Sequence, residues 1–380
     1  MNILWIPHDA WRTGVYRRDQ HFINRLKKKH KVVVLSWEGG RKRDFKGYIE
    51  YLWKTFVPSV YEEKQVKMYK MPKFPTPGKP WMFPHFLFRE LNQIILNIYF
   101  RNIVRKGKID IAITGPNAAF VGYIKESHIP LIFDLLDCSD WSYDNPWKEM
   151  EKRYFLNSDG VLAVSSIAKK HAEMYNRNVL LLPNGVEVEK FQTEEKAEAK
   201  RKIGMEGKKI ISIIGPTFST KNPFMEAIMS IVQKHNSVRF IIVGENDKVK
   251  QLKLKFKHPS IFYLSYIPYS EIHHYFIASD IGLYPVEDSP YYHCAIPLKV
   301  LEYSAAGSWV VVSPKLEGVA SLNLPNVVFC RDNAKDLERT LMDLLNQSPP
   351  DATKKLKHLH WDVLSDKLDE FLMKILISRG

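Results

Sequence analysis

Three aspartates gather at the end of a short apolar segment in the first half of the chain. The range 129–136 has the apolar character of a buried strand, and the sequence FDLLDCSDW at its end places Asp134, Asp137 and Asp140 close together. The carboxyl end of a parallel strand delivers side chains to the ligand cleft of an α/β sheet, where a carboxylate can act as a general base. The alternative is capping of a helix predicted near Pro146, which explains one aspartate but not all three.

A second group of chemically useful residues lies in the range 283–313. A buried strand end is followed there by a polar and aromatic loop, and Pro297 then opens a helix that ends at Gly307. Lys299 and Glu302 fall in the first turns of this helix. The helix dipole and the free amides at its N-terminus form an anion site, and the glutamate can accept hydrogen bonds from hydroxyl groups.

A third feature is the sequence GPTFSTKNP, which follows the predicted strand Ile210–Ile214 and precedes a helix. Its glycine, its small hydroxyl side chains and Lys221 can hold a diphosphate through backbone amides and one cation. The sequence lacks the GxxxxGK[ST] pattern of a P-loop nucleotidase. No GxGxxG follows the first strand, which counts against a nicotinamide or flavin enzyme.

Nothing in the sequence calls for a metal or an organic cofactor. HExxH, GxSxG and CxxC motifs are absent, and Cys138, Cys294 and Cys330 lack the spacing of a metal site. The pair His273–His274 falls in a predicted helix and is expected at the surface rather than at a metal. We therefore predict neither a cofactor nor a metal.

The loop after the first predicted strand, Asn2–Ile6, also carries ligand-binding side chains. In HDAWRTGVYRRDQ, Gly14 would let the backbone approach a ligand closely, while Arg17 and Arg18 supply hydrogen-bond donors. A glycine needed only for the turn, with the arginines in solvent, explains the loop equally well.

These candidate sites require two α/β domains to position them. A chain of 380 residues is too long for one ordinary core, and strand-like and helical segments alternate along it, which predicts parallel sheets covered by helices. After the predicted strand Val179–Leu182, PNGVEVEKF leads into a charged segment, and this change of composition marks the domain boundary. The alternation begins again at Ile210, and a final amphipathic helix is predicted over His360–Ser378.

The positive charge of the chain is confined to its first third. Residues 1–108 hold 23 Lys and Arg against 8 Asp and Glu, out of 56 and 42 in the whole chain, so the remainder holds 33 against 34. Within that third, residues 41–83 mix Lys and Arg with aromatic side chains and are interrupted by proline. This composition favours peripheral contact with an anionic membrane, but it also suits single-stranded nucleic acid or a long surface loop. No apolar run approaches the length of a membrane-spanning helix.

Several of these segments together resemble the GT-B glycosyltransferases, in particular the large family 4 group. PNGVEVEKF resembles the PNGVDxxxF signature between the two domains of that group, and IIGPTFSTKN resembles its phosphate loop. FIIVGEND resembles the strand and glycine turn that follow. IASDIGLYP with PLKVLEYSAAGSWVVVS is similar to the signature helix of the group, and HWDVLSDKLDEFL to its C-terminal helix. The matches run over nearly the full length in the order of the family.

The resemblance implies two Rossmann-like, doubly wound domains that face a cleft. Residues 1–182 would form an acceptor-binding domain, residues 183–360 a nucleotide-sugar-binding domain, and a helix within 361–380 would cross back onto the first. Glu302 would bind the ribose hydroxyls of the donor and Lys221 would neutralise its diphosphate. The implied donor-binding set is Gly14, Gly215, Thr217, Lys221, Gly244, Ile267, Pro297, Lys299 and Glu302.

Two departures from the family pattern concern the charge at the diphosphate. Pro216 and Thr217 stand where the family has an arginine, and Cys294 stands where the ExxxxxxxE pair would have its first glutamate. PLKVLEY instead places Lys299 about one helical turn before Glu302, where it can supply the missing positive charge. This variant resembles a branch that includes bacterial polysaccharide glucuronosyltransferases.

In that branch an aspartate of the N-terminal domain is the base and the configuration of the sugar inverts. Asp137 is then the first choice for the base, with Asp134 and Asp140 next, while Arg17 and Arg18 would contact the acceptor. If the chain instead follows standard family 4, configuration is retained and the aspartates only position the acceptor.

Together these features predict a metal-independent hexosyltransferase. It would move a sugar from a nucleotide-diphosphate donor such as a UDP-sugar to a glycan or lipid-linked acceptor, in the assembly of cell-surface polysaccharide or glycoconjugate. The chain opens directly with a strand, so a cytoplasmic location with contact to the inner membrane face is expected. The alternatives are a GT-B-like sugar-nucleotide epimerase or catalytically inactive partner, and a nucleic-acid-binding protein, which leaves the phosphate loops without a purpose.

Overall fold

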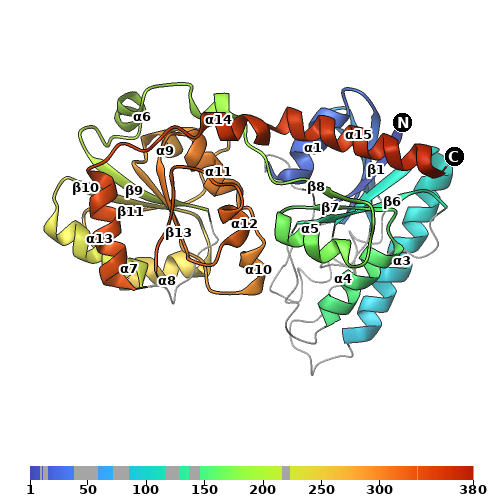
Figure 1. The fold of residues 1–380 in the computed structure, drawn as a ribbon, viewed down its shortest axis with the longest axis horizontal. Coiled ribbons are helices and arrows are strands. Elements are labelled where there is room, and N and C mark those ends of the chain that lie inside the picture. The colour runs from blue at the N-terminus through green and yellow to red at the C-terminus, as the bar shows by residue number, and fades with distance from the viewer. Residues whose placement is uncertain are drawn as a thin grey trace. The chain divides into compact units, whose positions relative to one another are not determined.

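The structure, a computed structural model, describes residues 1–8, 11, 16–37, 59–71, 85–115, 128–136, 146–215, 223–331 and 333–379. Its contacts divide the chain into two compact units. Unit 1 comprises Met1–Leu182 and Ser365–Gly380, and unit 2 comprises Pro183–Leu364. Each unit is built on one sheet (Figure 1).

Unit 1 contains an eight-stranded sheet in the order β3-β4-β2-β1-β5-β6-β7-β8. Its strands are β1 (Asn2–Ile6), β2 (Lys31–Trp37), β3 (Ser59–Glu63), β4 (Val66–Met71), β5 (Ile111–Thr114), β6 (Leu131–Leu135), β7 (Gly160–Ala163) and β8 (Val179–Leu181). All neighbours are parallel except β3 and β4. The central β1 is buried from Ile3 to Ile6, as an apolar strand covered on both faces must be.

The helices of unit 1 follow the predicted alternation. They are α1 (Arg18–Leu26), α3 (His85–Gly107), α4 (Pro146–Asn157), α5 (Ser166–Glu173) and α15 (Trp361–Arg379), the last of which starts in unit 2. The helix α1 lies directly after the loop that follows β1. It begins after Arg17, whose backbone N–H donates to Gln20 Oε1 at 3.0 Å, and single turns follow Leu26.

The hairpin formed by β3 and β4 excludes the alternative of a long surface loop for the described part of residues 41–83. Here β4 pairs in parallel with β2 and antiparallel with β3. Val66 and Met68 are buried on one face of β4 and Met71 on the other, while Lys67 is exposed. The strand therefore contributes apolar side chains on both faces, and its sequence VKMYKM does not show a regular apolar–polar alternation.

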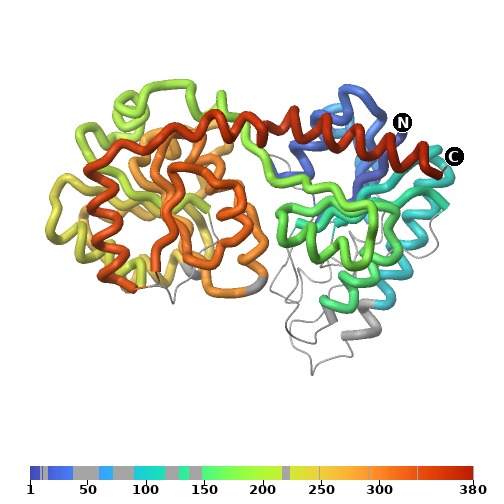
Figure 2. The backbone as a smooth tube through the Cα atoms, viewed as in Figure 1, coloured from blue at the N-terminus to red at the C-terminus, as the bar shows by residue number. Residues whose placement is uncertain are grey.

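The C-terminal part of α15 packs within unit 1. Its Asp369 carboxylate lies 2.6 Å from His30 Nε2, and Asp366 lies 2.8 Å from Lys29 Nζ. A Cβ atom on Gly160, at the start of β7, would come within 2.7 Å of the Phe371 ring, so this helix lies directly on the sheet. Both chain termini therefore belong to unit 1 (Figure 2).

Unit 2 contains a six-stranded, fully parallel sheet in the order β11-β10-β9-β12-β13-β14. Its strands are β9 (Lys209–Ile214), β10 (Val238–Val243), β11 (Ile261–Leu264), β12 (Ile281–Tyr284), β13 (Trp309–Val312) and β14 (Val327–Phe329). The bounds of β9 match the predicted strand Ile210–Ile214 within one residue. Each strand is a short run of mainly β-branched and aromatic residues between turn residues, which is the pattern of a buried parallel strand.

Helices cover both faces of this sheet (Figure 1). They are η1 (Val188–Phe191), α6 (Lys196–Lys202), α7 (Phe224–Lys234), α8 (Asp247–Lys255), α9 (Ile272–Ala278), α10 (Pro290–His293), α11 (Leu298–Ala305), α12 (Glu317–Ala320), α13 (Ala334–Leu345), α14 (Thr353–Leu356) and η2 (Lys357–Leu359). Ile211 and Ile213 of β9 join the apolar core with α7, α8 and α13. Ser212 points to the opposite face, where α9 and α11 lie.

No helix in the described part of the chain is long and apolar enough to cross a membrane.

Candidate functional site

The order in which the chain adds strands to the unit 2 sheet reverses at β9. The chain runs from β9 to β10 and β11 on one side and later places β12, β13 and β14 on the other. In open α/β sheets, ligands bind at the carboxyl ends of the strands beside such a switch point. Gly215 follows β9 with a φ of +116°, a backbone conformation that glycine adopts without a Cβ penalty. The chain leaves the sheet at this glycine, and the candidate site lies there.

Lys299 lies beside Gly215. A Cβ atom on the glycine would lie 3.5 Å from Lys299 Cε, so the aliphatic part of the lysine runs along the end of β9. Pro297 is the N-cap residue of α11 and Leu298 its first residue, which places Lys299 in the first turn. The fold thus brings the end of β9 to the positive end of the α11 dipole.

An ion pair joins Lys299 to Glu302. Lys299 Nζ lies 2.8 Å from Glu302 Oε2, one turn further along α11. The glutamate side chain is 10% exposed and the lysine side chain 31% exposed. The ammonium also lies 5.2 Å from the centroid of the Phe276 ring, in a cation–π contact. A lysine and a carboxylate are therefore held together at the amino end of this helix.

Lys190 joins this group and was missed by the sequence analysis. Its Nζ donates to Tyr269 O at 3.2 Å and lies 2.9 Å from the centroid of the Tyr269 ring. Burial lowers the pKa of Lys190 to about 8, while the nearby carboxylates of Glu187 and Glu302 oppose the shift and Lys299 adds to it. Lys190 and Lys299 therefore share one electrostatic environment with two carboxylates, those of Glu187 and Glu302.

The signal that identifies Lys190 is its place in PNGVEVEKF, the segment at the predicted domain boundary. The short helix η1 that carries it packs against both α9 and α11.

Tyr303 attaches α11 to the sheet. Its buried ring covers Gly282 of β12, where any Cβ atom would collide with the ring. The Tyr303 hydroxyl lies 2.8 Å from Ser212 Oγ, which lies 2.6 Å from Ser279 Oγ. Burial raises the pKa of the Tyr303 phenol, so its hydroxyl stays protonated and able to donate. These contacts anchor α11 to β9 and β12 and hold Lys299 in place.

The asparagine–glycine turn at the start of unit 2 supports the loop before α11. Asn184 Nδ2 donates to Ile296 O at 2.7 Å, immediately before the N-cap residue of the helix. A Cβ atom on Gly185 would lie 2.7 Å from both Leu359 O and the Trp361 ring, so only glycine fits between these groups. The PNGV sequence therefore helps to position the amino end of α11.

Gly244 and Ile267 lie at the ends of the next two strands. The Gly244 N–H donates to Leu264 O at 3.0 Å, and the Gly215 N–H donates to Val243 O at 2.8 Å. Both amides complete the sheet, so these glycines offer close approach to the backbone rather than N–H donors. Ile267 is half-buried in the loop after β11.

Unit 1 has its own switch point, between β1 and β5. His8 follows β1 and Gly115 follows β5, and a Cβ atom on the glycine would lie 3.2 Å from His8 Cβ. His8 Nδ1 is buried and has no hydrogen-bond partner in the described part of the chain. The sequence analysis did not name His8, although it immediately follows the first buried strand and one proline.

Asp134 and Arg18 form a buried ion pair in unit 1. Arg18 Nη2 lies 3.0 Å from Asp134 Oδ1, and Arg18 Nε lies 3.2 Å from both carboxylate oxygens. Each side chain is 4% exposed, so the alternative of a solvent-exposed Arg18 is wrong. Arg17 differs, because its side chain is 27% exposed and lies 3.4 Å from Asp19.

Five predicted site residues lie outside the described residues, and their roles remain predictions: Gly14, Asp137, Asp140, Thr217 and Lys221. The described donor-site predictions all fall in unit 2, and Asp134, Arg17 and Arg18 all fall in unit 1.

Comparison with known families identifies one part of this architecture. Residues 195–358, which lie within unit 2, match the family model "Glycosyl transferases group 1". A putative teichuronic acid biosynthesis glycosyltransferase, TuaH, of Bacillus subtilis (strain 168) is 28% identical over 188 residues. That match covers 47% of this chain, and it spans about half the length of the relative (46%).

Solved structures match the chain over its whole length. Sucrose-phosphate synthase from Thermosynechococcus elongatus has a TM-score of 0.71 at 13% identity and is covered completely, as is this chain. The α,α-trehalose 6-phosphate synthase from Burkholderia multivorans has a TM-score of 0.69 at 13% identity, with 100% of this chain and 99% of that chain covered. At such identity the likeness shows the fold alone, which is the α/β fold of the GT-B type.

Proposed function

We propose that this protein is a hexosyltransferase that moves a sugar from a nucleotide-diphosphate donor to a glycan or lipid-linked acceptor. The main support for this proposal is that Lys190, Lys299 and Glu302 lie close together at the carboxyl end of the unit 2 sheet, beside its switch point. Lys299 and Glu302 lie within the part of the chain that matches group 1 glycosyltransferases. The named role of the Bacillus relative supports a place in cell-surface polysaccharide or glycoconjugate assembly.

The proposed donor site uses these charges in two ways. Glu302 accepts hydrogen bonds from the ribose hydroxyls, because its carboxylate is nearly buried and already oriented by Lys299. Lys299, Lys190 and the amino end of α11 stabilise the negative charge that develops on the diphosphate as the sugar leaves. Positive charge from lysines removes the need for a metal in this step.

Other predicted residues complete the proposed donor site. Gly215, Gly244 and Pro297 give the diphosphate close access to the strand ends, and Ile267 lies where the base would contact backbone. Thr217 and Lys221 extend the site as its phosphate loop, with uracil our choice of base.

The proposed acceptor site lies in unit 1. Asp137 acts as the general base on the acceptor hydroxyl in an inverting reaction, with Asp140 the next candidate. Asp134 is the weakest of the three, because its carboxylate is already engaged by Arg18. The exposed Arg17 is the better of the two arginines for contact with the acceptor. Under a retaining mechanism these aspartates would position the acceptor only.

A donor screen tests the proposal. UDP-, GDP- and dTDP-sugars are added separately to the full chain and the midpoint of thermal unfolding is measured, since a ligand that binds only the folded state raises it. We expect a UDP-sugar to give the largest shift. Glu302→Ala should abolish the shift, whereas Glu206→Ala, an exposed position of the same unit, should retain it. A full shift in Glu302→Ala would mean that the donor binds elsewhere.

We further propose peripheral contact with the inner face of the cell membrane. Lys64, Lys67 and Lys70 lie on the β3–β4 hairpin and contact the rings of Tyr16, Tyr69 and Tyr61. Such basic and aromatic groups suit anionic headgroups. Replacing the three lysines by glutamine should reduce co-sedimentation with phosphatidylglycerol vesicles, while the same change at Lys253, Lys255 and Lys257 of unit 2 should not. Equal loss in both variants would contradict a specific membrane surface.

Two observations support other functions, namely an epimerase or inactive partner and a nucleic-acid-binding protein. An epimerase or inactive partner is supported by Pro216 and Cys294 at positions where the family has an arginine and a glutamate. Sugar transfer to an added acceptor, from the donor that the screen identifies, would dismiss both. Binding of DNA or RNA is supported only by the basic first third of the chain, and a salt-sensitive electrophoretic shift would revive it.

A further inference from the structure

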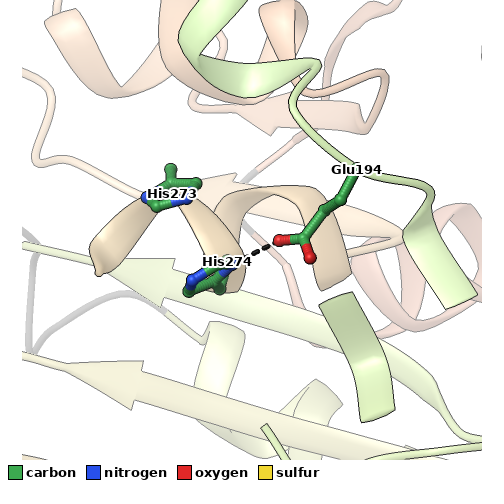
Figure 3. Close-up of side chains that lie close together, drawn as sticks. All are labelled: Glu194, His273 and His274. Atoms are coloured by element: carbon green, nitrogen blue, oxygen red, sulfur yellow. Dashed lines mark hydrogen bonds and ion pairs between the residues drawn. The ribbon is translucent and has the colours of Figure 1, made fainter. Parts of the chain in front are cut away.

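Three side chains that can ligate a metal meet where the segment before α6 reaches α9. Glu194 comes from that segment, and His273 and His274 are neighbours on α9 (Figure 3). One ligand atom from each lies within 4.8 Å of the other two. All three residues are half-buried, which corrects the expectation that the histidine pair lies at the surface.

The contacts inside this cluster leave a place for a cation. His274 Nδ1 is hydrogen-bonded to Glu194 Oε1, so one proton is shared between two atoms that can both ligate a metal. His273 Nδ1 is buried and has no hydrogen-bond partner in the described part of the chain. A metal ion could replace the shared proton and at the same time give a partner to a buried nitrogen.

We propose that Glu194, His273 and His274 bind a Zn²⁺ ion, with water completing a tetrahedral site. Two imidazoles and one carboxylate are a known ligand set for zinc, whereas Mg²⁺ and Ca²⁺ prefer oxygen ligands alone. With zinc bonds of about 2.0–2.2 Å, the hydrogen-bonded His274 Nδ1 and Glu194 Oε1 must separate to admit the ion. The ligand atom of His273, which lies within 4.8 Å of both, must approach them.

Lys202 is the cation that competes with zinc. Its Nζ lies 2.6 Å from Glu194 Oε2, while the hydrogen bond to His274 uses the other oxygen, Oε1. The lysine side chain is 46% exposed and can either turn into solvent or remain on Oε2 as a partner outside the coordination sphere. The glutamate can therefore bind zinc through Oε1.

The role of this ion is structural. It joins the segment after η1 to α9, and α9 packs on both α6 and α11. Lys190 lies on η1, and Phe276, which contacts Lys299, lies on α9. The ion therefore ties α9 to the segment that follows η1, next to the proposed donor site. This inference does not depend on the proposed reaction, because zinc binding and thermal stability are measured without a sugar donor.

The test uses the full chain without a histidine tag. The protein is stripped with a chelator, titrated with ZnCl₂ by calorimetry, and its bound metal is counted by mass spectrometry. We expect one zinc ion per chain and a thermal midpoint that rises with zinc and falls again with EDTA. His273→Gln and Glu194→Gln should each weaken zinc binding by at least about 100-fold, since loss of a ligand exceeds the effect of losing an outer partner.

A matched control separates this site from adventitious binding. His358 is exposed in the same unit, and His358→Gln should bind zinc like the parent chain. Equal zinc binding by the parent and by His273→Gln, or no binding by the parent, would overturn the proposal. If the ligand variants fail to fold, Co²⁺ bound to the parent decides: intense visible absorption supports a tetrahedral site with protein ligands, and its absence contradicts one.

Discussion

Each unit places an ion pair at the end of a parallel sheet, but the two pairs differ in exposure. In unit 1, the Arg18 and Asp134 side chains are each 4% exposed. In unit 2, Lys299 pairs with Glu302, and the Lys299 side chain remains 31% exposed. The ion pair of unit 1 is therefore buried, whereas the lysine of the unit 2 pair is accessible to a ligand.

This difference bears on the proposed donor and acceptor sites. An accessible lysine beside a helix N-terminus can bind an anion, as the proposed diphosphate site requires. A buried ion pair stabilises the fold and offers no free charge to an anion, which is compatible with the proposed position of an uncharged acceptor hydroxyl. The exposure of the ion pair, rather than the fold, distinguishes the two units.

Breaking the buried pair should have the largest effect on folding. Arg18→Ala leaves the Asp134 carboxylate buried without its partner, which costs about 3–5 kcal/mol of unfolding free energy. Urea unfolding monitored by circular dichroism measures the loss. Arg17→Ala is the control, because Arg17 is partly exposed and should cost about 1 kcal/mol or less.

A double variant sharpens this prediction. Arg18→Met with Asp134→Leu removes both charges, and it should recover most of the stability that Arg18→Ala loses. If Arg18→Ala is as stable as the parent chain, the Arg18–Asp134 ion pair does not stabilise unit 1.

Removing Lys299 should affect activity rather than folding. If Lys299 stabilises the departing diphosphate, Lys299→Ala should lower kcat by about 10²- to 10³-fold while the unfolding free energy changes little. Steady-state kinetics with the donor identified by thermal shift measures this. Lys253→Ala, at an exposed position of α8, should leave kcat unchanged. A similar fall in both variants would show that the effect is not local to α11.

Most of the sheet architecture could be predicted from sequence because each strand is a short apolar run bounded by turn residues. The predicted strands Asn2–Ile6 and Ile210–Ile214 form β1 and β9 within one residue, and α11 begins and ends as its proline and glycine indicate. The β3–β4 hairpin was not predicted, because the lysines and aromatic residues of 41–83 indicate a binding surface or a loop. The strand β4 buries residues on both faces, so no regular alternation marks it in the sequence.

The site was predicted less completely than the fold. Lys299 and Glu302 were found because one helical turn separates them, and that spacing is local. Lys190 reaches the same site only through the packing of η1 against α9 and α11, which sequence spacing does not reveal. The Arg18–Asp134 and Glu194–His274 contacts are likewise long-range pairings. Local patterns identify elements, whereas charge balance depends on which elements meet.

The smallest expected effect concerns the titration of Lys190 and tests whether its charge faces the donor. Its pKa is about 8, so donor affinity should fall as pH rises from 7 to 9.5, by at most about tenfold per pH unit above 8. Calorimetric titration with the nucleotide sugar measures this, and Lys190→Arg should flatten the profile because arginine stays charged.

The unfolding free energy should depend on pH in the opposite direction. In the unfolded chain Lys190 keeps its proton up to about pH 10.4, so its contribution to stability increases with pH between 8 and 10.4. Affinity and stability that fall together above pH 8 would therefore indicate loss of structure, and only divergent trends identify Lys190 as a donor-site cation.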